Sequence, residues 1–544
     1  MTNKEIGNKF QELAQLMEFH GENPFKIRTY QNVYATLRKL NEEVGRLSLD
    51  ELRKIKGIGD AVAAKIRELE DTGEMRTLRK YEDQTPAGIR EMLSIRGLGP
   101  KKIRTLYDQL QIESVGELKY AILENRLLEL PGFGVKTQED ILAKLTYFQE
   151  AKGLFRLASL DAVADRLNSK LIAEIPGGTF VYTGDYRRRM PVLSELAILV
   201  APRDYQALKG IGDQVFTSWQ ETPAGLQAIF DEIYPVRIIM SDQAAWAGEL
   251  VETTGGSIWK GRGVPAGNWD SEEAVFKAAK LPFLPPECRD LDEQSILKFD
   301  PDTLIKKQDI RGMIHLHTTF SDGINTLEEM AQAAADAGFE YLVVTDHSKS
   351  AVYANGLTVE RLASQWQAID RWNASNSLVI LKGIECDILV DGSMDYSHDI
   401  MTQFDVVIAS IHAQLKMDEE KATQRLIRAI EHPSVHILGH PTGRLLLSRS
   451  GYPVDHTKII DACAANRVSI ELNANPFRLD LDWTFLPYAR EKGVRISINP
   501  DAHSIRGYSD LDYGIMAARK GGLNRYECLN ALSGDEFLSY IRQK

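Results

Sequence analysis

Cysteine is scarce in this sequence, and long apolar runs are missing. The four cysteines, Cys288, Cys386, Cys463 and Cys528, lie far apart in 544 residues and form no C-x-x-C pair. This spacing argues against a disulfide framework and against a thiolate zinc site. No apolar run of about 18 residues and no secretory leader occurs, so we expect a cytoplasmic protein that does not contact a membrane.

Positive charge is also in short supply. The chain has 65 Lys and Arg against 77 Asp and Glu, which argues against a protein that coats nucleic acid nonspecifically. The acidic excess is uneven, because residues 1–150 hold 24 residues of each sign and residues 151–544 hold 41 basic and 53 acidic residues. The N-terminal part is therefore the better candidate for nucleic-acid contact. The length predicts three or more domains.

The first 150 residues combine helical spacing of apolar side chains with an internal repeat. Three segments share one pattern, namely "LRKIKGIGDAVAAKI" (52–66), "LSIRGLGPKKIRTL" (93–106) and "LLELPGFGVKTQEDIL" (127–142). Each predicts a short helix, a Gly-apolar-Gly turn and a second helix. The turn glycines are Gly57, Gly59, Gly97, Gly99, Gly132 and Gly134.

A hairpin of this kind is suited to a nucleic-acid backbone. The glycines allow a tight turn, and the amides that open the second helix face outward at a site suited to phosphate. Lys101, Lys102 and Lys136 in the second helices, with Lys56 and Arg96 before the turns, add positive charge. A plain turn between packed helices would explain one copy, but three copies favour DNA binding.

The segment 155–240 alternates predicted helices and strands, as in "TFVYTGDYRRRMPVLSELAILVAP". With the hairpins before it, this segment resembles the palm of a family X DNA polymerase, which carries Gly-Ser-x-Arg-Arg, an Asp-x-Asp pair and a later Asp. The alignment starts from Gly184 and the Arg187-Arg188 pair. Asp185 then replaces the serine, Glu195 and Ala197 take the Asp-x-Asp positions, and Arg237 takes the third acidic position.

These replacements bear directly on polymerase chemistry. Two carboxylates two positions apart share one face of a strand and can hold two Mg²⁺ ions for phosphoryl transfer. We therefore expect a degenerate palm without polymerase activity, kept as a structural or DNA-positioning remnant. The alternative is an active polymerase whose acids this alignment misplaces. The nearby candidates, none of which reproduces the pair, are Glu195, Asp204, Asp213 and Asp242.

Imidazole is concentrated in the last third of the chain, where ten of the eleven histidines lie between residues 315 and 503. Seven apolar runs there, from "MIHLH" to "RISINPDAH", alternate with predicted amphipathic helices and indicate a parallel (β/α)7-type barrel. The C-terminal ends of barrel strands gather on one face, so their polar ends should converge. These residues are His315, His317, His347, Glu385, His412, His440, Asp501 and His503, joined by Asp322 on the first loop.

Nine N and O ligands are more than a fold requires. They suit two or three divalent metals, Mn²⁺ or Zn²⁺ with Mg²⁺ as a further option. The His-x-His spacing of His315 and His317 puts both rings on one face of a strand, where they can hold one metal from the same side. The expected chemistry is hydrolysis of phosphate esters by water activated between metals.

The motifs "HLHTTFSDG", "VVTDHS", "GIECDIL", "ASIH", "GHPTGR" and "DAHS" resemble those of the PHP (polymerase and histidinol phosphatase) domain, from about Asp309 to the C-terminus. The resemblance implies that Glu385, which bridges two metals, and Asp501 are catalytic. Arg444 is expected to hold a phosphate oxygen unless it pairs with a nearby acid. The implied ligand sets are His315, His317, Glu385 and Asp501 for one metal, Glu385, His412 and His440 for a second, and Asp322, His347 and His503 for a third.

Taken in order, these parts resemble the bacterial family X polymerases over nearly the whole chain. We expect a multidomain protein, a 3′–5′ exonuclease in DNA repair that binds gapped or 3′-ended DNA as a monomer. The alternatives are a small-molecule phosphatase of the histidinol-phosphate type and a noncatalytic DNA-binding scaffold. The expected domains are an all-α DNA-binding domain (1–85), a fingers-like hairpin domain (86–153), an α+β nucleotidyltransferase-like palm (154–240), a thumb-like region (241–290), a linker (291–309) and a PHP metallohydrolase barrel (310–544).

Overall fold

The structure, a computed structural model, describes residues 1–38, 40, 43–95, 97–128, 130–150 and 153–544. Arg96, which the sequence places before the second hairpin turn, lies outside these residues. The chain divides into two compact units, one of residues 1–123 and 127–149 and the other of residues 124–126 and 150–544. Among the described residues, none of the helices combines the length and the apolar character that a membrane span requires.

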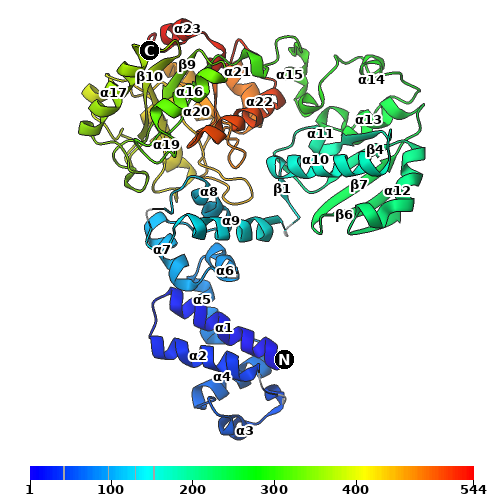
Figure 1. Ribbon diagram of the computed structural model, residues 1–544, viewed down its shortest axis with the longest axis vertical. Helices are drawn as coiled ribbons and strands as arrows, with labels where there is room; N and C mark the ends of the chain where they lie inside the picture. The colour runs from blue at the N-terminus through cyan, green and yellow to red at the C-terminus, as the bar shows by residue number, and fades with distance from the viewer. Residues whose placement is uncertain (39, 41–42, 96, 129, 151–152) are drawn as a thin grey trace. The chain divides into compact units, whose positions relative to one another are not determined.

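Within its described residues, the regular elements of the first unit are helices, as the apolar spacing predicts (Figure 1). Capping boxes start two of its helices, because the Thr2 and Ser48 side chains accept hydrogen bonds from Glu5 N and Glu51 N. One core of buried apolar side chains runs through the unit and includes Phe10. The helices are α1 (Asn3–Phe19), α2 (Pro24–Leu37), η1 (Val44–Arg46), α3 (Leu49–Lys54), α4 (Asp60–Thr72), α5 (Arg76–Gln84), α6 (Ala87–Leu93), α7 (Pro100–Leu110), α8 (Val115–Leu123) and α9 (Val135–Glu150).

The second unit opens with an α+β palm. Its five-stranded sheet has the order β2-β4-β7-β6-β5, in which β4 and β7 are parallel and the other neighbours are antiparallel. Leu167 and Leu208 from two helices pack on Ile198 of the sheet. The elements are β1 (Phe155–Arg156), α10 (Leu157–Glu174), β2 (Phe180–Thr183), α11 (Gly184–Arg187), β3 (Val192–Leu193), β4 (Leu196–Val200), α12 (Pro202–Val215), β5 (Ser218–Thr222), β6 (Gly225–Phe230) and β7 (Tyr234–Met240).

Short helices connect the palm to the barrel. They have a small core of their own around Trp259 and Phe276. Prolines at 285 and 286 stop regular helix at this point, as the sequence indicates. The elements are α13 (Trp246–Thr254), η2 (Ser257–Trp259), α14 (Glu272–Ala278), η3 (Pro286–Cys288), α15 (Glu293–Leu297) and η4 (Lys307–Asp309).

The last part of the unit is a seven-stranded barrel with strand order β8 to β14, and each adjacent pair is parallel. All seven predicted strands are confirmed. The barrel closes through the residues just after its first and last strands, since His317 N donates to Ala502 O over 2.9 Å. The strands are β8 (Gly312–Ile314), β9 (Tyr341–Val344), β10 (Val379–Asp387), β11 (Val406–Ser410), β12 (Ile437–Leu438), β13 (Ser469–Asn473) and β14 (Ile496–Asn499).

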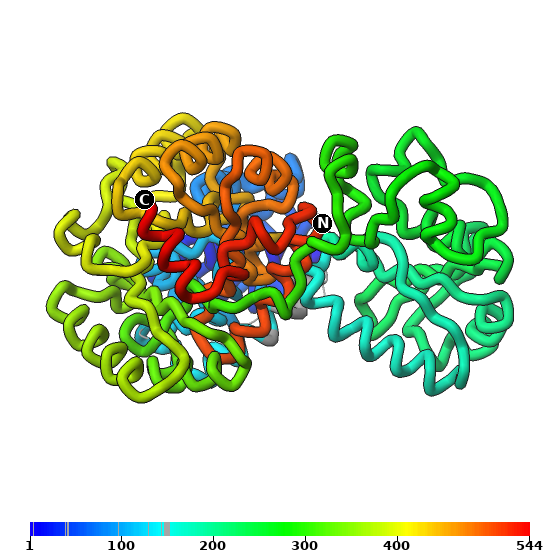
Figure 2. Tube along the Cα trace, turned by 90° about the horizontal axis from the view of Figure 1, so that it is seen from above, coloured from blue at the N-terminus to red at the C-terminus, as the bar shows by residue number. Residues whose placement is uncertain are grey.

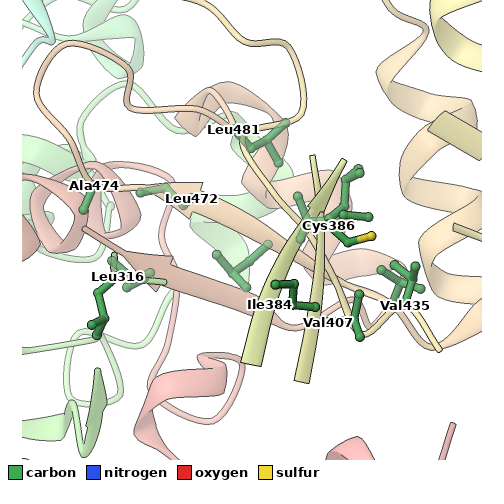
Figure 3. Packing of buried hydrophobic residues seen from close by; sticks show 14 of the residues in the cluster. Leu316, Ile384, Cys386, Val407, Val435, Leu472, Ala474 and Leu481 are labelled. Carbon is green, nitrogen blue, oxygen red and sulfur yellow. The ribbon is translucent and has the colours of Figure 1, made fainter. Parts of the chain in front are cut away.

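Helices surround these strands (Figure 1), and the C-terminal helix α23 lies on the barrel (Figure 2). Apolar side chains of neighbouring strands and loops, among them Leu316, Ile384 and Leu472, fill the core (Figure 3). The predicted fold class is confirmed. The helices are α16 (Leu327–Asp336), η5 (Val352–Ala354), α17 (Val359–Asn373), α18 (His398–Met401), α19 (Glu419–Ile430), α20 (His456–Asn466), η6 (Trp483–Phe485), α21 (Leu486–Glu491), η7 (Ile505–Asp510), α22 (Leu511–Lys520), η8 (Leu529–Ala531) and α23 (Gly534–Ile541).

Candidate metal centre and DNA-binding hairpins

The nine candidate ligands meet at the C-terminal ends of the barrel strands. Glu385 lies near the end of the long strand β10, and the other eight follow β8, β9, β11, β12 and β14. Five histidines surround the Glu385 carboxylate at distances between 2.9 and 3.6 Å. They are His315, His317, His347, His412 and His440.

The ligand atoms form four overlapping groups, each with all its atoms within 4.8 Å of one another. Two differences from the implied sets stand out. His317 joins the group around Asp322, and His440 groups with His315 while His412 groups with His347. The groups are His317, Asp322, His347 and His503; His315, His317 and Asp501; His315, Glu385 and His440; and His347, Glu385 and His412.

Two of these residues have a backbone conformation that side chains other than glycine rarely adopt. The φ angles are 64° at His315 and 54° at Asp501. Left-handed conformations at non-glycine residues cost about 1–3 kcal/mol each and persist only where the surrounding structure imposes them. Barrel closure supplies that constraint, because Ala502 N donates to His315 O over 3.3 Å.

Buried carboxylates outside the predicted set orient the histidines. Asp387 accepts from His412 Nδ1 over 2.6 Å, and Glu471 is hydrogen-bonded to His315 Nδ1. Glu471 also accepts from the backbone N of His440 over 3.1 Å. A carboxylate on one ring nitrogen determines which nitrogen is left to face a metal. Sequence reasoning missed both residues, although each belongs to a strand that ends at the site.

A third buried carboxylate, Asp346, organises the loop after β8. It accepts from Thr318 N over 2.8 Å, from the Ser321 side chain, and from Gln365 Nε2 over 2.7 Å. Burial raises the pKa of Asp346 in spite of the bonds from Ser321 and Thr318. This network holds the loop on which Asp322 lies.

The charges of the cluster are strongly coupled. Burial opposes the protonated form of His412, but the carboxylates of Glu385 and Asp387 outweigh it and raise its pKa to about 9. The pKa of His503 is likewise raised to about 9, because Asp322 outweighs the effect of burial. In contrast, burial together with His503 and His347 lowers the pKa of His317 to about 3. The carboxylates therefore attract positive charge, which a divalent cation would also supply.

The donor set fits divalent metals. Within the described part of the chain, several ligand atoms are buried without an aligned hydrogen bond, including His315 Nε2, Asp322 Oδ2 and His503 Nε2. Buried polar atoms left without partners are costly unless something satisfies them. Imidazole nitrogens and carboxylate oxygens are ligands for Mn²⁺ and Zn²⁺.

Arg444 pairs with an acid, which is the alternative that the sequence left open to a contact with phosphate. Its guanidinium pairs with Asp482, and its Nε donates to Arg478 O over 2.9 Å. A second arginine lies beside a candidate ligand, since Arg478 Nε is 4.0 Å from Asp501 Oδ2. Arg444 thus braces the loop that carries Arg478.

The aligned polymerase positions come together in the palm. Ala197 of β4 is opposite Arg237 of β7 in the parallel register, and a Cβ on Gly184 would lie 3.5 Å from the Ala197 Cβ. Arg237 Nε donates to Glu195 Oε1 over 2.8 Å. Asp185 pairs with Arg188. An ion pair and a methyl group thus lie at the positions that the sequence alignment assigns to the acids.

The three predicted hairpins share one geometry. The first glycine of each turn has a positive φ, 95° at Gly57, 92° at Gly97 and 87° at Gly132. The apolar residue between the glycines is buried in each copy, as Ile58, Leu98 and Phe133. The second glycines, Gly59, Gly99 and Gly134, face open space beside their Cβ positions.

The helices that follow the turns leave their first amides accessible. No side chain caps α4 at Gly59 or α7 at Gly99. Lys101 and Lys136 are exposed, whereas Lys102 is partly buried and its Nζ lies 5.7 Å from the centre of the Phe133 ring. In the first copy Asp60 pairs with Arg53 over 2.6 Å, which lowers the positive charge there.

The fold and the site define a multidomain metallohydrolase that joins helix-hairpin-helix repeats and an α+β domain to a PHP barrel. A helix-hairpin-helix domain model matches residues 1–75, a SAM-like helix-hairpin-helix tandem matches residues 89–146, and a PHP domain model matches residues 314–475. A protein of Bacillus subtilis (strain 168), the DNA polymerase/3′-5′ exonuclease PolX, is 32% identical over 100% of both chains. The chain belongs to the PolX family of enzymes.

The barrel also has relatives without the N-terminal parts. A "Probable phosphatase" of Thermoanaerobacter sp. (strain X514) is 27% identical over 245 residues, which cover 42% of this chain and 94% of that protein. Another from Caldanaerobacter subterraneus subsp. tengcongensis is 27% identical and covers 42% of this chain and 90% of its own. The barrel thus occurs in a shorter kind of protein as well.

Proposed function

We propose that the chain is a metal-dependent phosphodiesterase that shortens DNA from its 3′ end, and that cleavage takes place in the barrel. The observation that carries the proposal is the convergence of five histidines on the buried Glu385 carboxylate. The hairpins in the same chain support DNA as the substrate, since a free small molecule needs no grip on a phosphate backbone.

Glu385 would be shared between metals, with His315, His317 and Asp501 on one side and His412 and His440 on the other. Asp322, His347 and His503 would hold a third ion. A bound divalent metal supplies Lewis-acid chemistry for attack on phosphorus. Asp387 and Glu471 would keep the His412 and His315 rings in the tautomers that leave a nitrogen free for it. The donor set favours Mn²⁺ or Zn²⁺ over Mg²⁺, which prefers oxygen ligands and water.

The other domains would bind and position DNA. We assign residues 1–85 and 86–153 to DNA binding, 154–240 to the palm, 241–290 to the thumb-like region, 291–309 to the linker and 310–544 to the nuclease. The palm would have lost polymerisation, since a cation lies at Arg237 and a methyl group at Ala197. We further propose a monomeric, cytoplasmic enzyme that processes gaps or 3′ ends during DNA repair.

One experiment tests the central proposal. A gapped duplex labelled at the 5′ end of the primer is incubated with Mn²⁺ and with wild-type protein or the Glu385→Gln variant. We expect stepwise shortening from the 3′ end by the wild type and none by the variant, which removes one charge but preserves shape. Equal shortening by both proteins would overturn the assignment of the barrel.

A second candidate is a phosphatase for small molecules, and the barrel's resemblance to phosphatases favours it. The same proteins are assayed on a phosphate monoester such as histidinol phosphate. Hydrolysis of the monoester with intact DNA would select the phosphatase, whereas the exonuclease proposal expects the opposite preference.

A further inference from the structure

The palm contacts the barrel beside one of the candidate metal ligands. Arg156 of β1 is buried, and its guanidinium carbon lies 3.9 Å from the centre of the Phe477 ring in the loop after β13. Both side chains are thus part of a fixed contact between the two domains. Cation–π contacts gain strength when the cation is removed from water, as here.

The loop that contains Phe477 also holds Asp501 in place. Asn473, where the loop begins, donates through Nδ2 to Asp501 Oδ2 over 3.0 Å, and Arg478 Nε is 4.0 Å from the same oxygen. Phe477 itself is fixed on both sides of its peptide, because its N donates to Asn475 Oδ1 and its O accepts from Leu446 N over 2.7 Å. A shift of Phe477 would therefore be transmitted to the residue next to it, Arg478.

The palm also contacts the segment that follows Asp501 in the chain. Helix α22, which follows Asp501 and His503, packs Tyr513 and Met516 against the palm core. Burial and the nearby carboxylate of Asp161 on α10 raise the pKa of the Tyr513 hydroxyl. The segment between β14 and α22 is thus tied to the palm at its far end.

The same helix ends in a buried ionic contact. Lys520 is fully buried, pairs with Asp290, and donates to the backbone O of Arg188 over 3.3 Å. Arg188 Nε donates to Asp290 over 3.2 Å. Its neighbour Arg187 pairs with Glu272 over 2.6 Å. The two arginines that align with the polymerase motif are therefore engaged in joining the palm, the thumb-like region and the barrel.

We infer that the palm is a positioning element for the metal centre, and that Arg156, through Phe477, holds the β13 loop so that Asn473 and Arg478 keep the Asp501 carboxylate in place. This inference rests on the proposed function. It explains why an intact palm fold accompanies a polymerase site without its acids. The palm's task is to hold two segments that flank Asp501, the loop 474–482 and the helix α22.

The test is a double-mutant cycle on Arg156→Ala and Phe477→Leu in the full chain. Loss of a residue that hydrogen-bonds a metal ligand typically lowers metal affinity or activity 10- to 100-fold. We therefore expect each variant to weaken Mn²⁺ binding and to slow cleavage by about 10-fold. Isothermal titration calorimetry with Mn²⁺ alone gives the first quantity. The double variant should lose no more than either single variant, because both act through one contact. Arg156→Lys, which keeps the cation, should restore part of the affinity.

Control measurements distinguish a loss of Asp501 positioning from a general loss of folded structure. Arg166→Ala breaks an exposed ion pair with Asp231 within the palm and should leave Mn²⁺ binding unchanged. DNA affinity should be the same for all variants, and each should keep a cooperative melting transition. Wild-type Mn²⁺ affinity in Arg156→Ala, or additive losses in the double variant, would overturn the inference.

If Arg156→Ala folds poorly, a further variant still tests the inference. Tyr513→Phe keeps the ring against the palm core and removes only the hydroxyl that interacts with Asp161, and it should weaken Mn²⁺ binding in the same direction. Unchanged binding there would refute the inference. If the wild type binds Mn²⁺ but cleaves no DNA, the proposed function fails while the calorimetry still decides the positioning role.

Discussion

Arg237 Nε of β7 donates a hydrogen bond over 2.8 Å to Oε1 of Glu195, the residue that precedes β4. An ion pair of this kind leaves no pair of carboxylates free for two metals. The residue beside Arg237 in the register is Ala197, whose methyl group offers no ligand. These contacts support the proposal that the palm has lost polymerisation.

We predict that the chain adds no nucleotides to a primer. The measurement uses the Glu385→Gln variant, so that nuclease activity cannot hide extension, with a gapped duplex, all four nucleotides and either Mg²⁺ or Mn²⁺. The primer should keep its length in both metals. Extension by even one nucleotide would show that the acids lie elsewhere in the palm.

Asp387→Asn should weaken the metal centre although the residue is not expected to bind metal. The Asp387 carboxylate accepts from His412 Nδ1 over 2.6 Å and from the Ser350 hydroxyl over 2.6 Å. Loss of such a partner costs about 10- to 100-fold in metal affinity or activity. Mn²⁺ titration measures the effect, and Asp399→Asn, at an exposed site in the same domain, is the control. Equal affinity in the two variants would contradict this role.

Lys101→Gln combined with Lys102→Gln should weaken DNA binding and make it less sensitive to salt. Each phosphate contact contributes about one unit to the slope of log affinity against log salt, so the slope should fall by about 2. Fluorescence anisotropy at several salt concentrations gives the slope. Lys26→Gln, an exposed lysine on α2 outside the hairpins, serves as control. An unchanged slope in the double variant would rule out the second hairpin as a phosphate contact.

Stability should fall in acid through His436. Its Nδ1 accepts from Val407 N over 3.0 Å, and burial, together with Lys544, lowers its pKa to about 4. The unfolded value is about 6.5, so the stabilisation is complete above that pH and is lost as the pH falls from about 6.5 to about 4. We expect the free energy of unfolding to fall by about 2 kcal/mol over this pH range, because the residue is partly exposed.

His436→Asn isolates that contribution. An asparagine keeps an acceptor near Val407 N but does not titrate, so its unfolding free energy should depend less on pH between 6.5 and 4. Urea denaturation at several pH values measures the difference. Parallel pH curves for the variant and the wild type would exclude His436 as the source.

Most of the metal centre could be predicted from the sequence because barrel geometry is regular. Residues at the ends of successive parallel strands must meet on one face, so reading His412 after β11 and His440 after β12 was enough to bring them together. The hairpins could be predicted equally well, since Gly97 and Gly99 form one turn within a few residues of each other. The repeat itself indicated that these turns were alike.

The supporting residues could not be predicted in this way. Glu471 lies 156 residues from His315 in the chain, and in "SIELN" it follows the ordinary alternation of a strand. Arg444 could have faced a phosphate or an acid, and its partner Asp482 lies 38 residues away. Nothing local distinguishes such pairs, because their distances depend on how loops fold over the barrel.

The sequence alone predicts the order of the domains, the nine candidate ligands, the hairpin turns and a palm without its acids, since each follows from short-range spacing and residue chemistry. What surrounds these residues became visible only in the folded chain. The Arg237–Glu195 ion pair, the contact of Arg156 with Phe477 and the burial of Lys520 against Asp290 all join residues far apart in the chain. Their energies depend on burial and on distances of a few ångströms, which no sequence pattern specifies.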